Sequence, residues 1–264
     1  MAELLSYLFM QRALLACLLV GTLCSTVSFF VVLRRLSFLG IGISHAALGG
    51  IALGVVTGID PIITGGTFAV ATAMGTGIIS RGGRLPEDTV TGILYATGMA
   101  FGIALISSFH GYYPELFSIL FGNILAIDSR ELWQLLAVSA AVLLYIYLFF
   151  KELLALSFDE EMARALGLPV DALSLGLLIA IGLTVICSAR LVGTLLVSAL
   201  LVIPAATGHR LSRHFRSMLA IALLVGNLGG IGGVILSYYY PVPSGAAIVL
   251  IMAAIFAGSL AVKR

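Results

Sequence analysis

The chain of 264 residues is 61% hydrophobic and only 10% charged, whereas a soluble domain carries roughly a quarter charged residues. Together with a mean hydropathy of +1.16, this composition excludes a soluble domain and predicts a polytopic membrane protein. The net charge of +2 indicates no nucleic-acid partner, and the odd count of three cysteines makes no disulfide framework.

The apolar runs predict an all-α protein with about nine transmembrane helices, eight to nine by their lengths. They lie near 13–33, 39–57, 62–80, 89–109, 132–150, 170–188, 191–207, 217–238 and 245–262. Each run approaches the length of about 20 residues that a helix needs to cross the hydrocarbon core. The apolar piece 116–127 is too short to cross and predicts a half-helix or re-entrant segment. No long polar region intervenes, so we expect one transmembrane domain over residues 1–264.

The basic residues are distributed unevenly between the two sets of connections. Eleven of the 14 lysines and arginines fall on one side, and the other side holds Arg12, Arg130 and Arg190. Cytoplasmic connections carry the excess of positive charge. The pattern therefore predicts an extracellular N-terminus and a cytoplasmic C-terminus.

His45 is the ionisable residue that stands out within a predicted span, in the stretch SFLGIGISHAALGGIALG (37–54). It lies about eight residues beyond the inner end of its helix, which places it about 12 Å deep. Polar groups at that depth are costly and are functional-site candidates by default. Neutral imidazole is a common ligand for zinc, manganese and related ions. The alternative is a structural histidine that hydrogen-bonds to a neighbouring helix.

A single histidine makes a poor metal site, so it would need companions with polar or sulfur ligands. The candidates are Ser44, Asn227, Thr22, Ser25, Cys17 and Cys24. Asn227 either lines a cavity or bonds to a neighbouring helix, and buried cysteines usually serve packing. His45, Ser44 and Asn227 are the metal-pathway candidates that we retain.

The chain shows no catalytic motif and no ATP-binding loop of the G-x-x-x-x-G-K-[ST] type. Its acidic residues all fall at span ends or in connections. A proton-coupled carrier usually needs a carboxylate within the membrane, and a membrane enzyme that used His45 would lack a partner nucleophile or acid. We therefore expect no enzymatic activity, and the energy for any transport should come from elsewhere.

The connection KELLALSFDEEMARALGLPV (151–170) predicts a short helix between two spans. Asp159, Glu160 and Glu161 favour its first turn, where acidic groups complement the helix dipole. Gly167 and Pro169 then end it. The helix would carry Phe158, Met162, Ala163 and Leu166. It is either a solvated interfacial helix or a handle that inserts into a partner, and the pattern alone favours neither.

The chain resembles the permease subunits of metal-type ABC transporters, the zinc and manganese importers. Besides 37–54, the resemblance rests on LFGNILAID (120–128), LSFDEEMARALGLPV (156–170), LVGTLLVSALLVIPAAT (191–207) and VPSGAAIVL (242–250). It implies a homodimer of permeases in the prokaryotic inner membrane, two ATP-binding subunits, and an extracellular or periplasmic metal-binding protein. Zinc or manganese would be the substrate, ATP would bind the partner subunit, and no cofactor would be bound permanently. Residues 156–168 match the family's coupling helix, which docks on the ATPase.

One departure from the family concerns His45. Many members have an aspartate four residues earlier, on the same helix face, where this chain has Ile41. Loss of this hard oxygen ligand favours zinc over manganese or iron(II). Alternatively, Asn227 or backbone carbonyls replace it, or the cargo is a metal chelate. The sequence thus predicts an ATP-driven importer of divalent metal, with a proton-coupled carrier or a chelate permease as alternatives.

Overall fold

The computed structural model describes residues 7–81, 85–108, 122, 124 and 127–261. Its elements are α2 (Leu8–Leu33), α3 (Ser37–Thr57), α4 (Pro61–Ser80), α5 (Glu87–Ser108), α7 (Ser129–Leu148), α8 (Phe150–Phe158), α9 (Glu160–Ala165), α10 (Val170–Val192), α11 (Thr194–Leu200), α12 (Ile203–Leu211), α13 (Phe215–Tyr239) and α14 (Ser244–Ala261). The predicted all-α class is confirmed. Most of the half-helix predicted at 116–127 lies outside the described residues.

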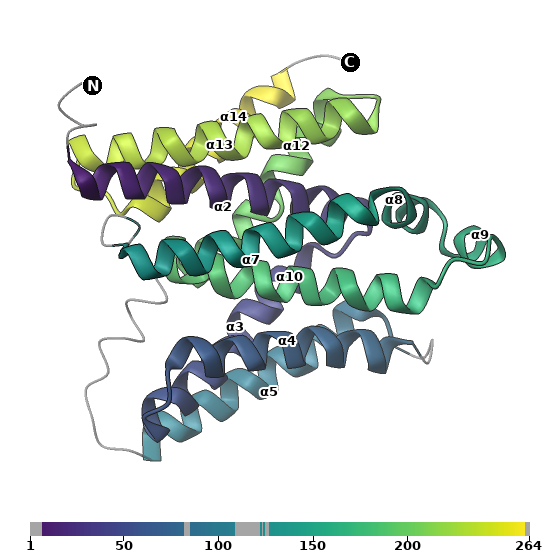
Figure 1. Cartoon of the computed structure of the whole chain (residues 1–264), viewed down its shortest axis with the longest axis horizontal. Helices are drawn as coiled ribbons and strands as arrows, with labels where there is room; N and C mark the ends of the chain where they lie inside the picture. Colours follow the sequence, from purple (N-terminus) through teal and green to yellow (C-terminus); the bar gives the residue numbers. More distant parts are fainter. Residues whose placement is uncertain (1–6, 82–84, 109–121, 123, 125–126, 262–264) are drawn as a thin grey trace.

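Within the described ranges, eight helices are long and apolar enough to cross a membrane: α2, α3, α4, α5, α7, α10, α13 and α14. They correspond to eight of the predicted spans, and the expectation of eight to nine is confirmed. The short helices α8 and α9 lie between α7 and α10, at one end of the bundle (Figure 1).

The segment 191–207, predicted as one uninterrupted span, forms two short helices instead. Gly193 has a φ of 96°, a left-handed conformation that ends α10 and precedes α11. Pro204 stands in the first turn of α12, where a missing N–H is tolerated, but it would interrupt a continuous helix. Because α10 ends and α13 begins at opposite ends of the bundle, the broken pair still carries the chain across (Figure 1).

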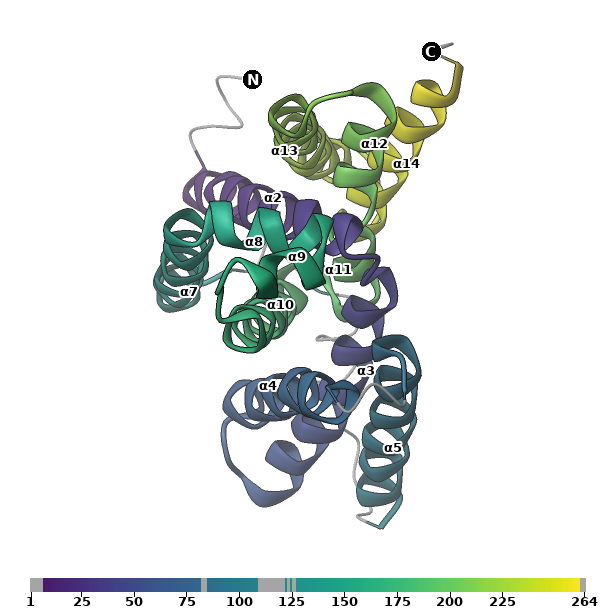
Figure 2. The same ribbon diagram turned by 90° about the vertical axis from the view of Figure 1, so that its right-hand side faces the viewer.

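The helices form two groups that meet along α10. In one group α3 packs against both α4 and α5, and in the other α13 packs against α2, α12 and α14. Helix α10 contacts α4 on one side, and α7 and α2 on the other. Figure 2 shows the group of α3, α4 and α5 set apart from the group of α12, α13 and α14. Helix α3 therefore lies at the junction, with α11 packed against it.

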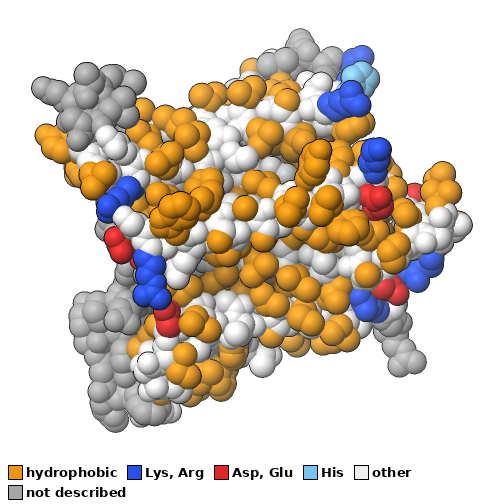
Figure 3. Space-filling model, in the orientation of Figure 1, with side chains coloured by type: hydrophobic (Ala, Val, Ile, Leu, Met, Phe, Trp, Pro, Cys, Tyr) orange, Lys and Arg blue, Asp and Glu red, His pale blue; other side chains and the backbone are white. Residues whose placement is uncertain are grey.

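The surface repeats the pattern expected of a membrane-spanning bundle. In Figure 3 hydrophobic side chains cover the middle of the molecule, and charged side chains gather at its two ends. Large apolar residues within spans are exposed on the outside of the bundle, such as Leu144 on α7 and Leu250 on α14. The exposed apolar side chains of this belt suit contact with the hydrocarbon core of a membrane rather than with water.

The contact between α3 and α5 depends on glycine. A Cβ atom added to Gly98 would lie 3.0 Å from the Cα atom of Ala46, and one added to Gly102 would lie 2.9 Å from that of Gly49. A Cβ atom on Gly49 would overlap the carbonyl oxygen of Gly98. Small residues of this kind let helix backbones approach closely in lipid. They fix the rotation of α3, and with it the direction in which His45 points.

Candidate functional site

His45 lies near the middle of α3, and its ring is oriented by its own helix. Its Nδ1 atom is 2.9 Å from the carbonyl oxygen of Ile41. A carbonyl oxygen only accepts, so Nδ1 carries the proton and donates it. Nε2 of the neutral ring then holds the free lone pair, and the described residues offer this atom no hydrogen-bond partner. A histidine that ligates a metal commonly donates its other ring N–H to a carbonyl in this way.

The face of α3 that carries His45 is the one that the rest of the chain leaves open. Phe38 and Ile41 are 37% and 36% exposed, and His45 and Leu48 are partly exposed. Their spacing of three and four residues places all four on one side of the helix. Tyr95 of α5 flanks this stripe, with its ring centroid 5.3 Å from that of His45 and the ring planes at 84°.

The other two predicted pathway residues do not join His45. Ser44 is buried, and its hydroxyl donates to the carbonyl oxygen of Gly40 at 2.7 Å. Asn227 of α13 faces α2: its Nδ2 atom is 3.3 Å from the hydroxyl oxygen of Thr22 and 2.9 Å from the carbonyl oxygen of Leu223. Asn227 thus bonds to a neighbouring helix, the second of the two roles that the sequence left open.

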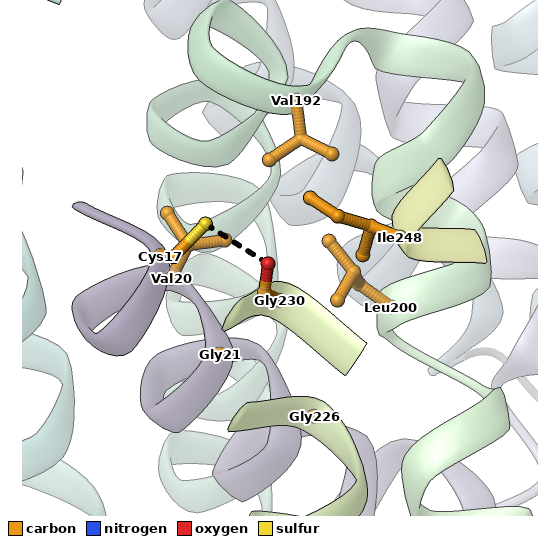
Figure 4. Close-up of a pocket in the computed structure, with 8 residues that line it drawn as sticks. All are labelled: Cys17, Val20, Gly21, Val192, Leu200, Gly226, Gly230 and Ile248. Atoms are coloured by element: carbon orange, nitrogen blue, oxygen red, sulfur yellow. Dashed lines mark hydrogen bonds between the residues drawn. The ribbon is translucent and has the colours of Figure 1, made fainter. Parts of the chain in front are cut away.

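The cysteines and Ser25 are likewise buried between helices. The thiol of Cys17 donates to the carbonyl oxygen of Gly230 on α13 (Figure 4). It borders a cavity of about 10 Å³ with a mostly aliphatic lining, large enough for one water molecule at most. Cys24 lies 3.3 Å from the hydroxyl oxygen of Ser188. Ser25 is fully buried on α2. These contacts are packing contacts and supply no second ligand to His45.

Among the described residues, no three histidine, cysteine, aspartate or glutamate side chains gather closely enough to hold a metal ion. A closed site of the structural type, with four side-chain ligands, is therefore absent from this part of the chain. What α3 offers is one imidazole nitrogen on a partly open helix face. Such a site suits the passage of an ion better than its retention.

The short helix predicted between two spans is present as α9, and the end of α8 precedes it. The Asp159 carboxylate accepts from the backbone N–H of Met162 at 2.9 Å and caps the helix. Gly167, with a φ of 79°, ends it. The apolar side chains divide into two sets, because Ala163 is buried, whereas Phe158, Met162 and Leu166 are 69%, 61% and 66% exposed.

Met162 and Leu166 are four residues apart and lie on one side of α9, and Phe158 ends α8 just before it. Helices α8 and α9 lie at an end of the molecule where charged side chains gather (Figures 1 and 3). A cluster of large apolar side chains at such a place marks an interaction surface. Ala163 packs against the bundle and Gly167 ends the helix. The exposed trio and Glu161 are the side chains that remain accessible to a partner.

Two residues of this region were not singled out from the sequence. Tyr95 gave no signal, because an aromatic side chain within a span is ordinary. Arg34 was counted only as a topology determinant, yet its side chain is 9% exposed and lies 3.6 Å from Glu160 of α9. The burial of Arg34 depends on contacts between distant segments, and no local pattern reveals it.

The sequence profile of the ABC 3 transport family matches residues 6–263. The chain is 38% identical over 255 residues to the manganese transport system membrane protein MntC of Halalkalibacterium halodurans, covering 97% of this chain and 87% of that protein. It is 37% identical over 259 residues to the chelated iron transport system membrane protein YfeD of Yersinia pestis, covering 98% and 87%.

Among solved structures, the fold is similar to a chain of PsaBC from Streptococcus pneumoniae, solved in complex with Fab. The TM-score is 0.84 at 35% sequence identity, over 100% of this chain and 96% of that one. The eight apolar spans, the exposed helix at their charged end and these likenesses lead to one conclusion. The chain belongs to the ABC 3 transport family and is the membrane permease, not the ATPase, of an ABC importer for divalent metals.

Proposed function

We propose that the imported metal ion passes along the open face of α3 and binds transiently to Nε2 of His45. The observation that carries this proposal is the tautomer of the ring. Nδ1 donates its proton to the carbonyl oxygen of Ile41, which leaves the lone pair of Nε2 free to bind a metal ion on a partly open face. A single neutral ligand lowers the cost of dehydrating the ion without trapping it. Membership of an ABC family removes the proton-coupled carrier from consideration.

Two observations bear on the identity of the ion. The nitrogen ligand without a neighbouring carboxylate favours zinc over the harder manganese ion, so the donor set makes zinc the first candidate. The names of the relatives favour the second candidate, manganese or iron, because MntC is named for manganese transport and YfeD for chelated iron. A chelate cargo would account for the missing carboxylate at Ile41, since the chelator would supply the oxygen ligands.

The permease needs partners, which we infer from its family and from its surface. A second copy would cover the open stripe of Phe38, Ile41, His45 and Leu48, because an imidazole facing lipid at this depth is costly. Two ATPase subunits would dock on Phe158, Met162 and Leu166. A metal-binding protein would deliver the ion at the opposite end. The excess of lysines and arginines at the α8–α9 end supports a cytoplasmic position for that end.

The test is the metal content of cells that express the chain with its ATPase and binding protein. Elemental mass spectrometry would compare the wild type with His45→Ala and with His214→Ala, a matched control at an exposed position outside the spans. We expect the content of one metal to rise in cells that express the wild type. Its uptake should be at least about tenfold lower with His45→Ala and should stay high with the control variant.

The identity of the rising element decides between zinc and manganese or iron. Iron uptake that requires an added chelator would establish a chelate cargo. A rise that survives His45→Ala, with equal amounts of protein in the membrane, would show that His45 is structural.

A further inference from the structure

A buried arginine connects the coupling helix to the helix that carries His45. Arg34 ends α2, three residues before α3 begins, and its side chain is only 9% exposed. Nη1 donates to the hydroxyl oxygen of Ser174 on α10 at 2.9 Å. Nη2 lies 3.6 Å from Oε2 of Glu160 on α9. The guanidinium group of Arg34, which lies between α2 and α3, thus contacts both α9 and α10.

The contacts continue beyond Arg34. The second carboxylate oxygen of Glu160 is 3.4 Å from Nη2 of Arg164. The same nitrogen lies 3.3 Å from Oδ1 of Asp171 on α10. At the end of α4, Arg81 donates to the backbone oxygen of Asp171. These groups line a polar cleft of about 680 Å³ at the end of the bundle onto which Figure 2 looks.

The members of this cluster differ in how much they depend on one another. Arg164 and Asp171 are more than half exposed, and ion pairs of that kind contribute little. The Arg34 side chain is only 9% exposed, and its acidic neighbours are Glu160 and Glu87. Removal of Glu160 therefore takes away one of the two charges that compensate this cation. The planar guanidinium donates to Ser174 with one nitrogen and forms an ion pair with Glu160 through the other, which the point charge of a lysine does not reproduce.

The position of Arg34 in the chain gives these contacts a consequence. A displacement of α9 would move Glu160, and through the ion pair with Arg34 it would pull on the corner that starts α3. Helix α3 is a stiff rod that is fixed closely to α5 by glycine. Movement of its first turn therefore changes the tilt of the helix, and with it the place of His45.

We propose that Arg34 is a positioning residue that couples the ATPase to metal transport by linking Glu160 of the coupling helix to the start of α3. This inference rests on the proposed function, since it needs an ATPase at α9 and a metal path along α3. The arginine does not touch the cargo. Its role is to make the motion of the coupling helix and the motion of α3 a single event.

The experiment uses the whole importer, with its ATPase and binding protein, reconstituted in vesicles. ATP hydrolysis and uptake of the metal that the wild type carries are measured on the same preparation, so that ions moved per ATP can be compared. The variants are Arg34→Gln, Glu160→Gln, the double variant and Arg34→Lys. Arg35→Gln is the matched control, because Arg35 is exposed and its side chain has no partner among the described residues.

We expect Arg34→Gln and Glu160→Gln each to lower the ions moved per ATP by about fivefold or more, the lower range of measured couplings between sites. The double variant should be no worse than either single one, because both remove the same link. Arg34→Lys should recover part of the ratio, and Arg35→Gln should keep all of it.

An unchanged ratio in both single variants would overturn the inference. So would an equal fall of hydrolysis and uptake, because a merely structural role predicts that result. Glu160 is half exposed, so Glu160→Gln still tests the link if Arg34→Gln does not fold. A wild-type importer that hydrolyses ATP but moves no metal would overturn the proposed function itself, and the inference with it.

Discussion

At the scale of single residues, the role proposed for His45 requires that one imidazole can serve as a ligand in the middle of a membrane. The carbonyl oxygen of Ile41 has two lone pairs, so it accepts from the Nδ1–H of His45 in addition to its helical partner. This bond holds the ring without a second side chain and leaves Nε2 free. Tyr95 packs edge-on against the ring and limits its rotation.

The residue at position 41 leads to a prediction about metal selectivity. Ile41 stands one helical turn before His45 on the same partly open face. Ile41→Asp would add a hard oxygen ligand beside Nε2, so we expect manganese uptake relative to zinc to rise at least about tenfold, a typical effect of a group that supports a metal site. Competition uptake in vesicles measures this ratio.

Ile41→Asn is the matched control, because it has the size of aspartate without the charge, and it should shift the ratio far less. An aspartate that left metal preference unchanged would show that position 41 does not face the path.

The sequence was informative about His45 and uninformative about its companions. The place of His45 in the middle of a span follows from hydropathy alone. Ser44 and Asn227 were chosen because they are polar, but the partner of a polar group is set by the rotation of each helix. The close glycine contacts of α3 with α5 turn Ser44 inward, and Asn227 faces Thr22 on α2.

At the scale of elements, α9 shows how a six-residue helix presents a surface. A helix this short has little stability of its own. The Asp159 cap, the left-handed Gly167 and the buried Ala163 fix its ends and its underside. Only then do Met162 and its neighbours point away from the bundle. The acidic start and the Gly-x-Pro end could be predicted from the sequence, because helix caps depend on residues that are neighbours in the chain.

If the exposed trio at the α8–α9 segment docks on the ATPase, each large side chain should contribute measurably to the binding free energy. Phe158→Ala removes an aromatic ring that is 69% exposed, so it should not destabilise the permease. If the ring fills a pocket on the ATPase, its loss should cost about 2 kcal/mol of binding free energy, which corresponds to a dissociation constant about thirtyfold higher. Titration of detergent-solubilised permease with the purified ATPase measures the dissociation constant.

Tyr239→Ala is the control, since Tyr239 is 60% exposed at the other end of the bundle. Equal affinities of Phe158→Ala and the wild type would remove Phe158 from the docking surface.

The broken segment α11–α12 shows where element prediction fails. Hydropathy over 191–207 is uniform, and glycine is so common in this chain, at 30 residues, that Gly193 did not stand out. Proline is also tolerated in membrane helices, so Pro204 alone does not predict a break. Only the positive φ of Gly193 shows that the backbone turns there.

At the scale of the whole molecule, the bundle is apolar around its middle and charged at its ends, yet it is incomplete as a transport path. The stripe of Phe38, Ile41, His45 and Leu48 opens onto the outside of the chain rather than into its interior. The described residues contain no enclosed metal site. A path with two walls therefore needs a second surface, and a symmetric partner is the simplest source of one.

Cross-linking tests whether a second copy supplies that wall. Single cysteines would replace Phe38, Ile41 or Leu48 on the stripe, and Leu144 or Leu250 on the outer faces of α7 and α14. The control positions are 57% and 64% exposed, so reagent access favours them over the stripe. The natural cysteines are buried or partly buried, and the wild-type chain gives the background. A short bifunctional maleimide is then applied to native membranes.

We expect covalent dimers from the stripe positions and only background from Leu144 and Leu250. The physical reason is that a partly exposed imidazole on the bilayer-facing side of a lone chain would be unfavourable, whereas the same imidazole between two copies faces a shared path. Dimers that form through α7 or α14, and not through α3, would place the partner elsewhere. His45 would then face lipid, and the route of the ion would have to lie within a single chain.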